Sequence, residues 1–551
     1  MKINTKLSLA FLIIALLFII TGTIFIVNSH NSLADAAFNQ LISTRTDKKI
    51  QIEEFFAERK HDMHILLDTV DLFRLNGFEK LNFIRESRKL QIEKYFQEQL
   101  HHISFFSRTL SMSKAIFEHD EAHKVGTDSH DITEQEITNE CKIEIDKLKN
   151  TYRYHNVLLV ATDGDIVYDT SKNNFTGNIL QNELKDSVSS DIFQQGIKKI
   201  TVHDFSILNN VPVFSISTPV YTSENKIGGI LIIYITFDVI NEIVQKKVGI
   251  TGEAYLIGDT NGNTSYRSKR LVQNKENSIG IQKTGNDIKE AFAGNSNVRI
   301  KIGSTEQAEI TSYAPLEIPD LNWVIIVTKN LEEYFSITRS NETENFFSQY
   351  IAEYNYHDLL LIHPQGDIFY TVTHEADYKT NIINGKYSTS SLGLLIKEVL
   401  KTEQYSITDY APYIPSNGEP AAFIAQPLIV NGKIEMIVAV QLNDVVMNQI
   451  VQQKAGLGKS GEAYLVGSDN LMRSNSYHDS KHFSVKAAFA NPNINKIDNA
   501  TVNAALAGKT GITTIPEYHD INTSVLTAYT PVTISDKITW ALLTEIDKDE
   551  A

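Results

Sequence analysis

Two histidines one helical turn apart are the residues in this sequence most suited to catalysis: His119-Asp120-Glu121-Ala122-His123. Zinc proteases use this spacing, and the glutamate directly after their first histidine acts as base on metal-bound water. Asp120 holds that position here, and the neighbouring charges indicate a solvated helix end. We therefore expect no catalytic residue, metal or cofactor, and a metal-dependent hydrolase is only a distant alternative.

A second candidate is the glycine-rich segment 456–460 (GLGKS), which ends in the order that phosphate-binding loops use to place a lysine on phosphates. Such a loop needs glycine where Gln453 stands. It also follows a strand and precedes a helix, which is the reverse of the order expected here. We interpret the segment as a turn from a helix into a strand.

Several tyrosines and one carboxylate suit a pocket for a small molecule. Tyrosine rings supply apolar walls and their hydroxyls supply polar contacts. Asp409 suits a ligand ammonium group, or it caps a backbone turn, and core packing is the alternative role for each ring. We predict a ligand site of unknown chemical class at Tyr370, Tyr378, Asp409, Tyr410, Tyr413 and Phe423.

Two arginines recur beside related segments, Arg267 and Arg473, each followed by serine. An arginine of this kind can grip a ligand carboxylate. An internal salt bridge that holds a hairpin is the interpretation we prefer.

These residues belong to a segment that the chain contains twice. Residues 154–159 (YHNVLL) recur as 356–361 (YHDLLL), and residues 252–258 (GEAYLIG) recur as 461–467 (GEAYLVG). Matches in the same order with slowly drifting offsets indicate a duplicated module with loop insertions.

Each repeat alternates short β-branched and aromatic runs with Asp-Gly, Asn-Gly and Gly-Gly turns and single helical stretches. The pattern strand-strand-helix-strand-strand-strand predicts an α+β fold with antiparallel sheets. Each repeat holds two such lobes. We expect the four lobes at 131–237, 238–335, 336–442 and 443–551.

Residues 29–130 are predicted to form a helical stalk, interrupted by the stop signal Asn76-Gly77. A short repeat lies within it, KIQIE at 49–53 and KLQIE at 89–93. An amphipathic face needs a partner, so we expect parallel homodimerisation, with folding back within one chain as the alternative. The predicted face carries Ile52, Phe55, Phe56 and Leu66.

Residues 7–27 form an uncharged apolar run that is long enough to cross a bilayer as a helix. Lys2 and Lys6 precede this run and no lysine or arginine follows until Arg45, which predicts a cytoplasmic N-terminus. We expect residues 1–28 to be a cytoplasmic tip and a single membrane anchor in the plasma membrane. The bulk of the chain would then be periplasmic or extracellular.

The composition excludes other classes. A net charge of −16 argues against a nucleic-acid partner, because such surfaces need clustered lysine and arginine. The lone Cys141 cannot form an internal disulfide, so hydrophobic cores must hold the fold together.

The order of features resembles the double-Cache extracytoplasmic sensor of bacterial chemoreceptors and sensor kinases. The resemblance is carried by a long helix, an Asp-Gly-Asp or Gln-Gly-Asp hairpin, a Gly-Glu-Ala-Tyr-Leu strand and a closing Tyr-x-Pro followed by Trp. The second repeat, from about Glu344 onward, resembles this family best.

The resemblance implies tandem PAS-like lobes and a small-molecule pocket in the membrane-distal lobe, here that of the second repeat. It also implies a signal-transduction receptor. A methyl-accepting chemotaxis protein is the first expectation, and a histidine kinase or diguanylate cyclase sensor is the alternative.

Overall fold

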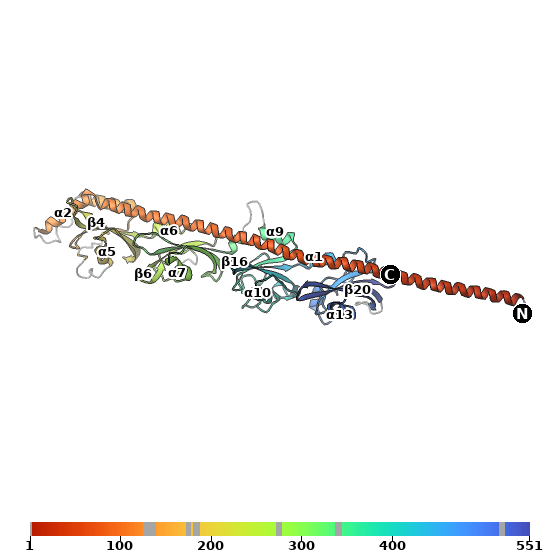
Figure 1. Ribbon diagram of the computed structural model, residues 1–551. Helices are drawn as coiled ribbons and strands as arrows, with labels where there is room; N and C mark the ends of the chain where they lie inside the picture. The colour runs from red at the N-terminus through yellow and green to blue at the C-terminus, as the bar shows by residue number, and fades with distance from the viewer. Residues whose placement is uncertain are drawn as a thin grey trace. The chain divides into compact units, whose positions relative to one another are not determined.

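The computed structural model describes residues 3–124, 139–171, 178–179, 188–271, 278–336, 344–516 and 524–550. The chain forms two compact units (Figure 1). Unit 1 comprises Met1–Phe73 and Phe335–Ala551, and unit 2 comprises Arg74–Tyr334. Unit 2 is therefore inserted into the sequence of unit 1.

A single long helix, α1 (Ile3–Phe106), contributes its first part to unit 1 and the rest to unit 2. The stop predicted at Asn76-Gly77 is wrong, because the helix continues through it. A Cβ atom at Gly77 would lie 2.8 Å from Ile310 and 3.1 Å from the Tyr334 ring. Glycine stands there because the helix approaches its neighbours closely.

Unit 2 contains two α+β lobes. The first consists of α2 (Leu110–Lys124), α4 (Asn139–Tyr152), β1 (Asn156–Ala161), β2 (Ile166–Asp169), α5 (Val188–Gly196), β3 (Thr201–Leu208), β4 (Val211–Tyr221) and β5 (Ile227–Thr236). The second consists of α6 (Asp238–Val244), β6 (Glu253–Thr260), β7 (Asn263–Tyr266), α7 (Asn286–Phe292), β8 (Asn297–Ile302), β9 (Ala308–Pro315) and β10 (Trp323–Asn330), and α8 (Glu332–Phe335) follows it.

Unit 1 also contains two lobes. The first consists of α9 (Phe346–Glu353), β11 (Tyr356–Ile362), β12 (Ile368–Thr371), α10 (Ser391–Thr402), β13 (Ser406–Ile407), β14 (Ala411–Tyr413), η3 (Ile414–Ser416), β15 (Glu419–Ala421), β16 (Phe423–Val430) and β17 (Lys433–Leu442). The second consists of α11 (Asp444–Val451), β18 (Glu462–Val466), α12 (Val485–Ala490), α13 (Ala500–Leu506), β19 (Gly511–Pro516), β20 (Ser524–Ser535) and β21 (Ile538–Asp547).

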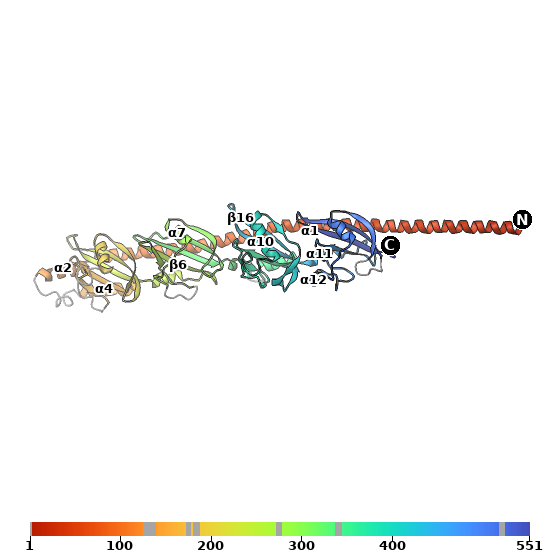
Figure 2. The same ribbon diagram turned by 90° about the horizontal axis from the view of Figure 1, so that it is seen from below.

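The sheets repeat one topology. The strand orders of the four main sheets are β2-β1-β5-β4-β3, β7-β6-β10-β9-β8, β12-β11-β17-β16-β13 and β18-β21-β20-β19, and neighbouring strands are antiparallel. The last of these lacks the outer strand that begins the other three, and β14 and β15 form a separate two-stranded sheet. The predicted α+β class with antiparallel sheets is confirmed. Within each unit, α1 lies along one face of the sheets and the lobe helices α5, α7, α10 and α13 lie on the other (Figures 1 and 2). Strands covered on both faces are buried throughout, as β1 is.

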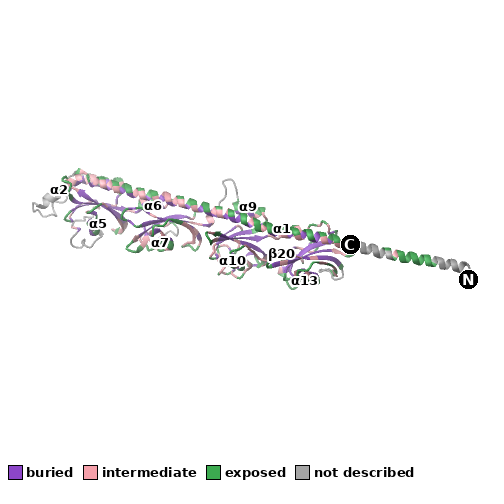
Figure 3. Cartoon of the chain, viewed as in Figure 1, coloured by how far each residue is buried: buried purple, intermediate pink, exposed green. Residues whose placement is uncertain are grey.

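The apolar face of α1 packs on the lobes of its own unit (Figure 3). Ile52, Phe56 and Leu66 are buried against unit 1, and Ile92 and Phe96 occupy the same kind of position in unit 2. The short repeat in α1 therefore marks two places where the helix docks on a pair of lobes. The face predicted to dimerise is already covered within one chain.

Equivalent basic residues fasten α1 in each unit. The Lys48 ammonium donates to the carbonyl oxygens of Ile450 (3.0 Å), Val451 (2.8 Å) and Gln453 (3.0 Å), at the end of α11. Arg88, forty positions later, donates to the carbonyl oxygen of Val244 at 2.9 Å, at the end of α6. Each cation lies where the helix dipole leaves partial negative charge.

Within the described part of the chain, no helix reaches the length and apolarity needed to cross a membrane. The span predicted at residues 7–27 lies partly outside the residues whose side chains are described.

Candidate functional site

An aspartate, an arginine and a tryptophan join the two lobes of unit 2, and we call them the unit 2 joint. Asp204 stands on β3 of the first lobe, while Arg267 follows β7 and Trp323 opens β10 in the second. The arginine binds the carboxylate through two bonds, Nε to Oδ1 and Nη2 to Oδ2, both 2.7 Å. The indole N–H donates to Oδ1 at 2.8 Å.

The unit 2 joint is buried and its carboxylate is ionised. Arg267 is 1% exposed and Asp204 16% exposed. Burial raises the pKa of Asp204, but the hydrogen bonds and charge of Arg267 outweigh it and leave the pKa below its ordinary value. Thr260 also donates to Oδ2, at 2.8 Å. The fully bonded carboxylate makes this a strong connection between the lobes.

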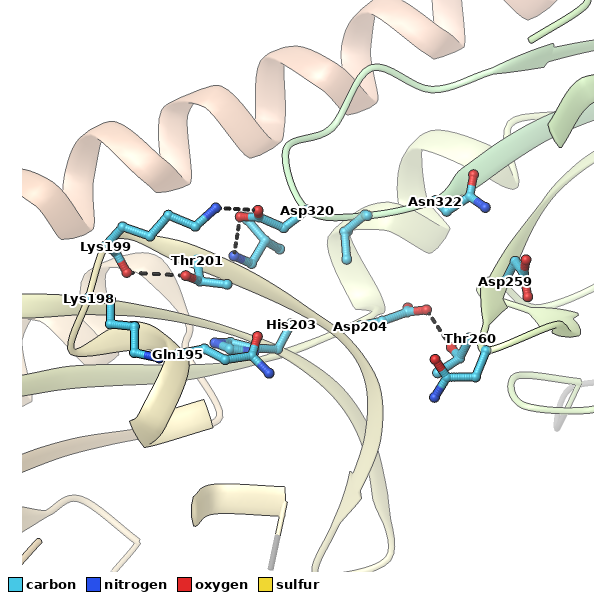
Figure 4. A pocket seen from close by; sticks show the side chains of 13 residues that line it. Gln195, Lys198, Lys199, Thr201, His203, Asp204, Asp259, Thr260, Asp320 and Asn322 are labelled. Carbon is cyan, nitrogen blue, oxygen red and sulfur yellow. Dashed lines mark hydrogen bonds and ion pairs between the residues drawn. The ribbon is translucent and has the colours of Figure 1, made fainter. Parts of the chain in front are cut away.

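A cleft of about 870 Å³ opens beside this joint, between the lobes (Figure 4). Lys199 from the first lobe pairs with Asp320 from the second at 2.7 Å, so a second ion pair crosses the cleft. Burial lowers the pKa of His203 to about 4, which keeps its ring neutral at pH 7, and Nε2 lies 2.7 Å from Ser217 Oγ. The lining residues are Gln195, Lys198, Lys199, Thr201, Val202, His203, Asp204, Asp259, Thr260, Asn261, Asp320, Leu321 and Asn322.

Unit 1 builds the same connection from Asp409, Arg473 and Trp540, the unit 1 joint. Arg473 Nε and Nη2 donate to the Asp409 carboxylate at 2.6 and 2.9 Å, and the indole N–H donates to it at 3.1 Å. Arg473 also pairs with Asp469 at 3.0 Å. Burial lowers the pKa of Arg473, but the two carboxylates outweigh it and raise the pKa.

A cleft of about 660 Å³ lies between the lobes of unit 1. A hydrogen-bonded chain lines it: Ser416 Oγ donates to Glu375 at 2.6 Å, and His357 Nε2 lies 3.0 Å from the other Glu375 oxygen. The hydrogen bond that His357 donates to Glu375 raises the pKa of the histidine. The chain places glutamate between serine and histidine, so it does not activate the serine as a nucleophile.

The six residues predicted to bind ligand fall in different places. Tyr410 lines the unit 1 cleft, whereas Asp409 is engaged by the joint. Tyr413 and Phe423 are fully buried in the core under α10, with their ring centroids 4.8 Å apart. The Tyr413 hydroxyl donates to the buried Asp377.

The other two predicted residues lie elsewhere in the same lobe. Tyr370 is buried beside Phe335 and Phe347, with ring centroids 6.3 and 5.7 Å away. Tyr378 is half-buried, and its ring lies tilted against that of His374, with centroids 4.3 Å apart. The structure therefore does not bring the six residues into one described cavity, and their role in ligand binding stays a prediction.

The preferred interpretation of Arg267 and Arg473, an internal salt bridge, is confirmed, although each bridge joins two lobes rather than one hairpin. Sequence analysis missed the aspartate partners. The signal was present, because an aspartate, an arginine and a tryptophan recur in the same order in both repeats.

The glycine-rich segment 456–460 is a turn from α11 into β18, as predicted. Its backbone N–H groups at Lys459 and Ser460 donate to the carboxylate of Glu550, at 2.7 and 2.6 Å. In unit 2, Ile250 and Thr251 hold Glu333 in the same way, at 3.0 and 2.9 Å. The anion on each turn is thus a side chain of the protein itself.

Among the residues that the structure describes, no group of three or more histidine, cysteine, aspartate and glutamate side chains is arranged to hold a metal ion. The side chains of His119 and His123 lie outside the described residues.

Comparisons with known proteins locate a family within the chain. Residues 79–338 match the model of the Cache domain family. No curated protein matches the chain. The motifs predicted the stronger resemblance in the second repeat, whereas the match falls on the first.

Three chemoreceptor domains are among the solved structures that the comparison matches to part of this chain. The ligand-binding domain of Pseudomonas aeruginosa PctB with L-Gln is 12% identical, with TM-score 0.32, covering 47% of this chain and 93% of its own. Pseudomonas fluorescens CtaA with L-leucine is 12% identical, with TM-score 0.33, covering 48% and 100%. The sensory domain of Campylobacter jejuni Tlp3 is 14% identical, with TM-score 0.33, covering 48% and 98%.

The family match begins within α1 and ends after α8, so it takes in the docking helix and both lobes of unit 2. Unit 1 has the same components: a section of α1 followed by two lobes whose sheets repeat the strand orders of unit 2. Residues 79–338 of this chain match the Cache domain family, and the paired lobes of each unit fit a double Cache arrangement.

Proposed function

We propose that the chain is the extracytoplasmic ligand-sensing region of a membrane-anchored bacterial signal-transduction receptor. The Cache match over residues 79–338 is the observation that carries this proposal. The clefts between the lobes of each unit supply space for a small molecule. A methyl-accepting chemotaxis protein is our first choice of receptor, and a histidine kinase or diguanylate cyclase is the alternative.

Thermal-shift screening tests the sensing function. The chain from residue 35 onward is heated with amino acids, amines, organic acids or purines, because a ligand that binds only the folded state raises the melting temperature. We expect one class to raise it in proportion to the logarithm of ligand concentration. Failure of all four classes, confirmed by calorimetry, would contradict the proposal.

The site residues proposed from the sequence can be tested with the same ligand. Removing one partner of a charged contact costs about 2 to 5 kcal/mol of binding free energy. Asp409→Asn weakens the lobe joint as well, so Tyr410→Ala, which alters the wall of the unit 1 cleft, is the better variant. If Tyr410→Ala and Tyr378→Phe both bind the ligand with unchanged affinity, we would infer that the ligand site lies in unit 2.

We propose that residues 7–27 anchor the chain in the plasma membrane with the units outside. The charge pattern supports this orientation, since Lys2 and Lys6 precede the apolar run. Alkaline extraction of membranes that carry the full chain tests the anchor. A mature N-terminus beyond Val27 would contradict it.

We propose parallel homodimerisation through α1, with a different face from the one first predicted. In the unit 1 section, Ile50, Ile65 and Leu72 are 47%, 47% and 65% exposed. In the unit 2 section, Phe83 and Leu90 are 76% and 62% exposed. At about 100° per residue, these side chains lie opposite the buried face of the helix.

Cysteine crosslinking tests the proposed dimer face. A cysteine at Leu72 or Leu90 should crosslink between subunits, whereas one at the exposed Lys433, the first residue of β17, should not. The native Cys141 is buried and gives little background. Equal crosslinking at Leu72 and Lys433 would contradict a dimer through this face.

A further inference from the structure

The chain contains two tryptophans, and they occupy equivalent places in the two joints. Trp323 donates its indole N–H to Asp204 at 2.8 Å, and Trp540 donates to Asp409 at 3.1 Å. Both aspartates belong to the first lobe of their unit and both tryptophans to the second. Each indole hydrogen bond therefore connects the two lobes of its unit, and a change in their relative position would alter it.

The same two rings contact the long helix. Trp323 meets Phe96 of α1 edge-on, with ring centroids 5.6 Å apart and an angle of 87° between the planes. Trp540 meets Phe56 at 5.6 Å and 78°. All four residues are buried. Because buried aromatic contacts are close-packed, an indole that shifts must move the phenyl ring it touches or open a void.

The indole is fixed at its polar end. The bidentate bond from Arg267 holds the Asp204 carboxylate, so the acceptor for Trp323 cannot turn away without breaking an ion pair. A second contact attaches α1 to the start of the second lobe, since Arg88 donates to the last carbonyl of α6. A change in the angle between the lobes thus has two routes to the helix.

We propose that Trp323 and Trp540 relay movements between paired lobes to α1, and that Asp204 and Asp409 position them for it. The inference builds on the proposed sensing function and names the residues that would carry its signal. It predicts coupling in both directions, because a coupling free energy between two sites is reciprocal.

Hydrogen exchange of the full chain without ligand tests the relay. Asp204→Asn should speed exchange in α1 around Phe96 by about tenfold or more, as expected for losing charge-assisted hydrogen bonds. Phe96→Ala should in return speed exchange in β3 around Asp204. The matched variants Asp409→Asn and Phe56→Ala should give the same effects around Phe56 and Asp409, and leave unit 2 unchanged.

Trp323→Phe is the second variant, in case Asp204→Asn does not fold. It keeps a six-membered aromatic ring but removes the indole N–H together with the five-membered ring that carries it, so it should speed exchange in α1 as well. If Asp204 only links the two lobes and does not act on α1, its substitution should speed exchange at β3 and β7 and leave exchange in α1 unchanged. That result would overturn the proposal. The measurement needs no ligand, so a failed ligand screen would count against the sensing function alone.

Discussion

The unit 1 and unit 2 joints share their polar contacts and differ in what surrounds them. In unit 2, Phe237 precedes α6 and stacks on Trp323, with centroids 6.0 Å apart and planes 25° apart. In unit 1, Asn443 precedes α11, and its side chain caps that helix by accepting from the N–H of Val445. Phe237 makes no such cap. One position therefore serves aromatic packing in one unit and helix capping in the other.

The arginines differ in a second respect. Arg473 has a second carboxylate in Asp469 at 3.0 Å. Arg267 instead donates its further hydrogen bonds to neutral groups, which include the hydroxyls of Ser265 and Thr260 at 2.6 and 2.9 Å. The ion pair and the indole bond are thus common to both units, whereas the means of supporting them vary. This difference predicts unequal responses to matched substitutions.

The largest effect is expected from removing the aspartates. Asp204→Ala leaves Arg267 buried without a carboxylate, which costs about 3 to 5 kcal/mol of unfolding free energy. Asp409→Ala should cost less, about 1 to 3 kcal/mol, because Asp469 still neutralises Arg473. Urea unfolding followed by hydrogen exchange in β4 and β16 separates the two units. An equal loss of unfolding free energy in both variants would show that Asp469 does not take over the role of Asp409 in neutralising Arg473.

Exchanging the divergent residue gives the next effect. Phe237→Asn removes a buried ring, which costs about 3 to 5 kcal/mol, and supplies a helix cap that returns about 1 kcal/mol. The net loss in unit 2 should be about 2 to 4 kcal/mol by the same urea measurement. Phe237→Leu, which keeps most of the volume, should lose less. If Phe237→Asn leaves the free energy of unfolding unchanged, the stacked ring does not contribute to stability.

Removing the cap in unit 1 should have a smaller effect. Asn443→Ala deletes the acceptor for the N–H of Val445 and should cost about 1 kcal/mol, read as a lower urea midpoint of unit 1. Asn443→Asp keeps an acceptor oxygen and should retain most of the stability. If both variants lose the same amount, the side chain acts by packing rather than by capping.

The smallest effect concerns pH. The Glu375 hydrogen bond raises the pKa of His357 in the folded state, and it lowers that of Glu375. The contribution of His357 to the free energy of unfolding is fully present below the pKa of the unfolded state, about 6.5. It disappears as pH rises through the higher pKa of the folded state. Because His357 is 43% exposed, the contribution should stay below about 1 kcal/mol.

Melting curves between about pH 5.5 and 8.5 check this sign. The wild-type chain should exceed Glu375→Gln in melting temperature at the acidic end, and the gap should close toward the alkaline end. A gap that widens with rising pH would contradict the assigned direction.

Local sequence patterns were sufficient to predict the α+β class and the antiparallel sheets. Asp-Gly hairpins and β-branched runs identified the strands, since turns and strand periodicity are encoded by neighbouring residues. The same patterns could not identify partners far away in sequence. The arginines were recognised as salt-bridge donors, but their partners lie 63 and 64 positions away in another lobe.

The helix α1 shows the same limit. Its periodicity identified a buried face around Ile52 and Leu66 correctly, but periodicity does not say what covers a face. Gly77 was interpreted as a stop because glycine weakens helices, whereas its position is explained by the close approach of Ile310 and Tyr334. The predicted ligand residues do not line one cavity for a related reason. Sequence patterns do not distinguish a ring in a pocket from a ring in a core, and Tyr413 and Phe423 pack in the core under α10.

The chain consists of two modules, and the sequence of unit 2 is inserted into that of unit 1. The boundaries of unit 1 favour excision, because Phe73 and Phe335 stack with ring centroids 6.0 Å apart. Chain ends that lie close together favour the insertion or excision of a module.

The most direct measurement is to express residues 74–334 alone, together with a second chain from residue 35 in which a short glycine-serine linker joins Phe73 to Phe335. Calorimetry should show one cooperative unfolding transition for each protein, at the temperature that its unit has in the full chain. If either protein is unfolded, or if unit 1 requires residues 74–334 to fold, the two-module account is contradicted.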